Sequence, residues 1–72
     1  MTDERYMGEI VARRKGRTQE PCTFKIGHVG HKHVVVRAID KDGIAPIVAL
    51  MDAQTARLFA DALIQSADTV DL

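Results

Sequence analysis

The sequence has few of the residues on which disulfide frameworks, base-stacking platforms and nucleophilic sites depend. Cys22 is the only cysteine, so no disulfide can form within the chain, and an unpaired thiol is typical of a reducing compartment. There is no tryptophan, and one tyrosine with two phenylalanines leaves no stacking platform for single-stranded nucleic acid. The only serine, Ser66, lies in a segment of helical periodicity, and no glycine-rich phosphate loop precedes that segment. We therefore do not expect an enzyme.

Long apolar runs are also missing. No stretch approaches the roughly 20 consecutive apolar residues that a membrane-spanning helix needs. The first five residues are polar and acidic, and they lack the apolar core of a signal peptide. The sequence therefore predicts a cytoplasmic protein without a membrane partner.

The length of 72 residues predicts a single domain near the lower limit for stabilisation by core burial alone. Domains of this size commonly gain stability from disulfides, from a metal or from a partner subunit. Since an internal disulfide is excluded, a metal or a partner would have to supply any such addition.

Four segments have the residue pattern of β-strands. The segment 23–29 alternates apolar and polar side chains with a period of two, and the valines at 34–36 are the strongest β signal. Gly43 suits the left-handed position of a tight reversal. Pro46 cannot donate a ladder hydrogen bond, so we expect it at an open edge or a bulge. The predicted strands span residues 6–13, 23–29, 32–39 and 44–51.

After the strands the hydrophobic period changes from two to about 3.6. Asp52 is a good N-cap, because its carboxylate can accept hydrogen bonds from the free amides of a first helical turn. A helix is predicted from Ala53 to about residue 67, with one apolar stripe. The stripe contains Ala56, Phe59, Ala60, Leu63, Ala67 and Val70, with Ile64 at its border. The sequence thus predicts an α+β fold: a small antiparallel sheet of three to four strands with one C-terminal amphipathic helix packed on one face through Phe59 and Leu63.

A helix covers one face of a sheet, yet the last two predicted strands carry apolar side chains on both faces. Whichever face the helix takes, a second apolar patch remains, and apolar patches commonly mark interfaces. One alternative is an irregular twist with a bulge at Pro46. The other is a covering chain, either a second copy or a different protein. The predicted interface residues are Val35, Arg37, Ile39, Ile47 and Met51, and Leu58 adds an exposed leucine on the polar side of the helix.

Formal charges balance, with ten basic and ten acidic side chains, but they are unevenly distributed. Basic residues gather in the loop after the first predicted strand, whereas aspartates lie near the C-terminus. The basic residues are Arg13, Arg14, Lys15 and Arg17. Three interpretations stay open for this loop: a solvated charged loop, contact with nucleic acid phosphates, and electrostatic docking on an acidic protein surface.

Histidines near the second turn raise the question of a metal. His31 and His33 are two residues apart, so on a strand they point to the same side, and Cys22 or His28 could add a third zinc ligand. The spacing matches no zinc signature, and surface histidines at a hairpin end are the alternative. Asp40-x-Asp42-Gly43 resembles the start of a calcium loop, but Met51 stands where that loop needs its closing glutamate.

These features favour a small non-enzymatic interaction protein. We expect it to self-associate, or to dock on a larger protein, through the face or edge of its sheet. A regulator or inhibitor of a nucleoprotein complex would suit the segregated charges. The alternatives are a nucleic-acid-binding accessory protein that uses the basic loop 13–17, and a small metal-binding domain that uses His31 and His33.

Overall fold

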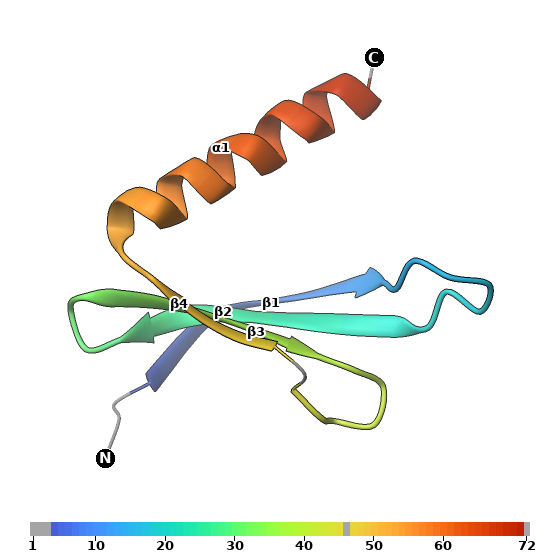
Figure 1. Ribbon diagram of the computed structural model, residues 1–72, viewed down its shortest axis with the longest axis horizontal. Helices are drawn as coiled ribbons and strands as arrows, with labels where there is room; N and C mark the ends of the chain where they lie inside the picture. Colours follow the sequence, from blue (N-terminus) through green and yellow to red (C-terminus); the bar gives the residue numbers. More distant parts are fainter. Residues whose placement is uncertain (1–3, 46, 72) are drawn as a thin grey trace.

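The chain folds into a four-stranded antiparallel sheet followed by one helix (Figure 1). A computed structural model describes residues 4–45 and 47–71. The elements are β1 (Glu4–Arg13), β2 (Pro21–Val29), β3 (His33–Ile39), β4 (Ile47–Met51) and α1 (Ala53–Val70). The strands lie in the order β1-β2-β3-β4, each antiparallel to its neighbour. The predicted α+β class, with a C-terminal helix after the strands, is confirmed.

The element bounds differ from the predicted ones mainly at β4 and α1. β4 starts at Ile47 rather than at residue 44, and α1 continues to Val70 rather than ending near residue 67. Pro46, expected at an edge or a bulge, lies outside the described residues. Gly43 has the predicted left-handed backbone, with φ of 81°. The Asp40 carboxylate accepts hydrogen bonds from the backbone amides of Asp42 and Ile44 at 3.0 and 3.1 Å, which fixes this turn.

The strand register divides the sheet into two chemically different faces, because residues directly opposite in neighbouring strands point the same way. We call one the apolar face. It carries Gly8, Ile10, Ala12, Cys22, Phe24, Ile26, Val34, Val36, Ala38, Ile47, Ala49 and Met51, with Arg5 and His28 as its polar residues. The other, which we call the network face, carries Glu4, Tyr6, Glu9, Lys25 and Arg37 beside the apolar residues Val11, Val29, Val35, Ile39, Val48 and Leu50.

The buried core of the single chain is very small. Among the described apolar residues only Val35, at 0% exposed, and Ala38, at 9%, are buried. Val35 lies on the network face and Ala38 on the apolar face, so neither side has a continuous core. On the apolar face, Ile10 and Ile47 are 53% and 62% exposed. Phe24, Ile26, Val34 and Val36 on the same face are half-buried, so the apolar face is partly open. On the network face, Val48 and Leu50 are 48% and 60% exposed.

The helix leaves its apolar stripe open too. None of the described residues of α1 is buried, and Phe59 and Leu63 are 51% and 58% exposed. Figure 1 shows α1 rising away from the sheet from its first turn onward, although its start remains next to β3. The expectation that Phe59 and Leu63 cover the sheet is therefore wrong for the single chain.

The direction of the helix follows from its very short connection to the sheet. Asp52 alone separates the end of β4 from the start of α1, whereas connections between strands and helices commonly have 2–6 residues. Asp52 is extended, with φ of −77° and ψ of 173°, and its carboxylate caps the helix by accepting a 2.8 Å hydrogen bond from the Thr55 amide. The predicted N-cap is thus confirmed, and the helix begins directly after β4.

Candidate interaction surface

The apolar face is hollowed into an open groove of about 490 Å³ at the end of the sheet where β2 begins. Side chains of the apolar face form its floor, and charged side chains form its rim. The floor residues are Cys22, Phe24, Ala38 and Ile47, and the rim residues include Arg14, Glu20, Asp40 and Lys41. On the rim, Lys41 pairs with Glu20 at 3.1 Å. An apolar floor inside a charged rim is the usual anatomy of a protein interface.

The helix stripe is a second uncovered apolar surface on the same chain. Its large side chains are all exposed: Phe59, Leu63, Ile64 and Val70. Leu58, on the opposite side of the helix, is 63% exposed, as the sequence predicts. An amphipathic helix on the surface of a globular protein normally buries such a stripe against its own domain. Here both the stripe and the apolar face of the sheet lack a cover.

The predicted interface residues do not form one patch. The register pairs Val34 with Met51 and Ala38 with Ile47, which places Met51 and Ile47 on the apolar face. Val35, Arg37 and Ile39 lie on the network face, and Val35 is fully buried there. The predicted grouping is wrong because the register of β4 fixes its side-chain directions. Of the five residues, Ile47 is the one in the open groove.

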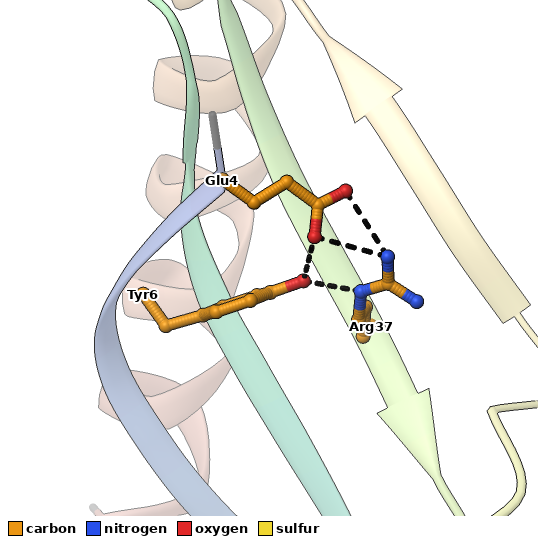
Figure 2. A network of polar contacts seen from close by, with 3 residues as sticks. All are labelled: Glu4, Tyr6 and Arg37. Atoms are coloured by element: carbon orange, nitrogen blue, oxygen red, sulfur yellow. Dashed lines mark hydrogen bonds and ion pairs between the residues drawn. The ribbon is translucent and has the colours of Figure 1, made fainter. Parts of the chain in front are cut away.

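Arg37 belongs to a polar network that ties β1 to β3 across β2 (Figure 2). Its Nη2 lies 3.0 Å from both carboxylate oxygens of Glu4, and its Nε donates to the Tyr6 hydroxyl. Tyr6 in turn donates to Glu4 Oε2 at 2.7 Å, and the Lys25 ammonium lies 5.9 Å from the Tyr6 ring centre. Arg37 therefore has a structural role within the sheet, which the sequence pattern did not reveal.

The network shifts the pKa of each of its members. The hydrogen bond from Tyr6 and then that from Arg37 lower the pKa of Glu4, since both favour the ionised carboxylate. Desolvation, followed by the bond to Glu4, raises the pKa of the Tyr6 hydroxyl. The hydrogen bonds to Tyr6 and Glu4 raise the pKa of Arg37. All three shifts stabilise the state in which Glu4 is charged and Tyr6 is neutral.

The lowered pKa of Glu4 predicts a loss of stability in acid. A carboxyl group whose pKa is lower in the folded state stabilises the fold above its unfolded pKa, about 4.3, and loses that effect as the pH falls through the folded value. Glu4→Gln should lower the urea midpoint at pH 7 and reduce the further drop between pH 7 and pH 3. Asp52, whose pKa is lowered by its bonds to Thr55, acts in the same direction and remains in both proteins. An equal acid-induced drop in both proteins would contradict a role for Glu4.

The basic residues predicted at 13–17 do lie together, at the hairpin end between β1 and β2. Arg13 Nη1 donates to the Gln19 carbonyl at 3.2 Å, and the Arg14 amide donates to the Glu20 carbonyl at 2.8 Å. The side chains of Arg14, Lys15 and Arg17 are exposed, and no ion pair joins them to another residue of the described chain. They project a positive potential from this end of the sheet.

The histidines and Cys22 are not brought together. His28, His31 and His33 surround a shallow depression of about 270 Å³ near the start of α1, whereas Cys22 lies near the other end of β2. Cys22 and His28 are six residue steps apart along β2, or about 20 Å. Within residues 4–45 and 47–71, no cluster of three or more His, Cys, Asp or Glu could hold a metal. The predicted set of His31, His33 and Cys22 is therefore wrong, because the strand keeps its members apart.

Similarity to known proteins does not supply a function for the chain. None of the described helical segments is long and apolar enough to cross a membrane. Comparison of the chain with protein-family models, with curated proteins and with solved structures gives no match. The functional argument therefore rests on the two uncovered apolar surfaces of the molecule.

Proposed function

We propose that this is a non-enzymatic interaction protein that self-associates through the apolar face of its sheet and the apolar stripe of α1. The observation that carries the proposal is the amount of exposed surface. The accessible area is 6177 Å², compared with about 4,400 Å² for a compact monomer of this mass. The radius of gyration is 13.5 Å, compared with about 11 Å for a compact chain of this length. Both values are larger than those of a compact monomer, which supports a chain that buries more surface in an assembly.

The charge distribution favours a second copy over an unrelated partner. Residues 4–51 carry nine basic and five acidic side chains, for a net charge of +4, whereas residues 52–71 carry one arginine and four aspartates, for a net charge of −3. These opposite net charges favour the approach of the helix of one copy to the sheet of another, and they act at long range because Asp61 and Asp68 lie on the polar side of α1. Complementary charges of this kind speed encounter and set orientation. The chain is electrostatically complementary to itself.

The perturbed ionisable groups support a non-enzymatic role. Catalytic groups commonly have shifted pKa values inside a cleft. Here the shifted groups hold the structure together: Glu4, Tyr6 and Arg37 join β1 to β3, and Asp52 caps α1. The groove on the apolar face has a floor of Cys22, Phe24, Ala38 and Ile47, which offers contact area rather than acid–base chemistry.

Sedimentation velocity over a concentration series, from low to high micromolar, tests the proposal directly. We expect a dimer that dissociates only on dilution, with an association rate that falls as salt is added. Circular dichroism on the same samples reports whether the fold is retained at each concentration. A folded monomer at every concentration would contradict self-association.

A further inference from the structure

We infer that two copies associate by exchanging their helices, so that the apolar stripe of α1 from each copy packs on the apolar face of the other copy's sheet. The inference rests on the proposed self-association and specifies its geometry. It follows from three features of the single chain: the direction of α1, the matching lengths of the two surfaces, and the amount of surface left uncovered.

The first feature is the connection between β4 and α1. Asp52 is the only residue between the two elements and also caps the helix, so α1, which runs back above its own sheet at an angle, could lie flat on it only if the backbone at this cap changed. Figure 1 shows α1 rising away from the sheet, with its C-terminal end farthest from it. The same geometry presents the helix to a second molecule.

The second feature is the match between helix and sheet. α1 has 18 residues and is about 27 Å long, and β2 has nine residues and is about 30 Å long. Ala56, Ala60 and Ala67 give the stripe small side chains that permit close approach, while Phe59 and Leu63 supply bulk. One helix can therefore cover the apolar face along its length, including the groove around Phe24 and Ile47.

The third feature is area. The exposed surface exceeds that of a compact monomer by about 1,800 Å² per chain. Obligate dimers bury roughly 1,000–2,500 Å² on each subunit, so the excess is of the size that one such interface removes. A reciprocal exchange about a two-fold axis covers both apolar surfaces of both copies with a single repeated contact, and it closes the assembly at two subunits.

Cross-linking between two single-cysteine chains tests the exchange, because Cys22 already lies on the apolar face. One chain keeps Cys22, and the other carries Cys22→Ala with Ala67→Cys and a mass tag. After the two are mixed, a short bis-maleimide should join them, since any such link connects the sheet of one copy to the helix of the other. Ala60→Cys in place of Ala67→Cys provides a second position on the stripe. Asp61→Cys, on the polar side of the helix, is the matched control and should link much less.

A chain with both Cys22 and Ala67→Cys completes the test. Exchange predicts cross-linked dimers from this chain and almost no internally linked monomer. Internally linked monomer as the main product, or no link between chains at either stripe position, would overturn the exchange. If sedimentation nevertheless shows a dimer, self-association stands and only its geometry is wrong. A monomeric wild-type protein removes both proposals.

Discussion

Replacing Leu63 with aspartate is expected to dissociate the proposed dimer, raising its dissociation constant by about a thousandfold or more. Burying a leucine contributes about 2 kcal/mol, and two-fold symmetry makes each substitution count twice, for roughly 4 kcal/mol per dimer. A difference of 1.4 kcal/mol is a factor of ten in binding. The introduced carboxylate adds a desolvation penalty at the same place. Sedimentation velocity should then show a monomer at concentrations where the wild-type protein is a dimer.

Leu58→Asp is the matched control for this experiment. Leu58 and Leu63 lie in the same helix and are 63% and 58% exposed, so they differ mainly in the side of α1 that they occupy. Helix propensity and net charge change equally in the two variants. We expect Leu58→Asp to remain a dimer. Equal effects of the two substitutions would mean that the stripe is not the contact surface.

The sequence was sufficient for the elements of this fold because their signals are local. The N-cap at Asp52, the left-handed turn at Gly43 and the change of period after β4 depend on residues close together in the chain. Whether the helix packs on its own sheet, by contrast, does not depend on local residues. An apolar helix stripe such as that of α1 has the same sequence pattern whether the surface that covers it belongs to the same chain or to another.

The faces of the sheet could not be assigned from alternation alone, because β1 contains an irregularity. The register shifts between Tyr6 and Gly8, with Met7 as the extra residue. Tyr6 therefore points to the network face, while Gly8 and Ile10 point to the apolar face, although a regular strand would place all three on one side. The bond between Glu4 and Arg37 depends on this shift. A register shift is set by long-range pairing, so period-two reasoning gives no sign of it.

The candidate surface was half predicted. An uncovered apolar patch that contains Ile47, and the uneven charge, both followed from the sequence. The grouping of Val35 and Ile39 on one face with Ile47 and Met51 was wrong, because the register of β4 places Ile47 and Met51 on the other face. The loop between β3 and β4 is the reason. Its length and its proline leave the direction of the next side chain open until the pairing with β3 fixes it.

Gly27→Ala is expected to destabilise the protein severely, because β1 passes directly over this position. A Cβ on Gly27 would lie 1.9 Å from the Arg5 carbonyl oxygen and 2.7 Å from the Tyr6 Cα. These are backbone atoms of the paired strand, which cannot rotate away as a flexible side chain could. Figure 2 shows the Tyr6 side chain crossing β2 to reach Arg37, so separating β1 from β2 also weakens the polar network.

We expect the loss to be about 3 kcal/mol, at the upper end for overpacking. This corresponds to a fall of roughly 15 °C in Tm for a domain of this size. Thermal denaturation at one fixed protein concentration measures it. Gly8→Ala is the control, since it lies in β1 beyond the register shift and a Cβ there meets no atom within 4 Å. That variant should keep the wild-type Tm or exceed it slightly, because alanine restricts the unfolded chain more than glycine does. A Gly27→Ala protein as stable as Gly8→Ala would show that β1 does not cross Gly27 as closely as the register requires.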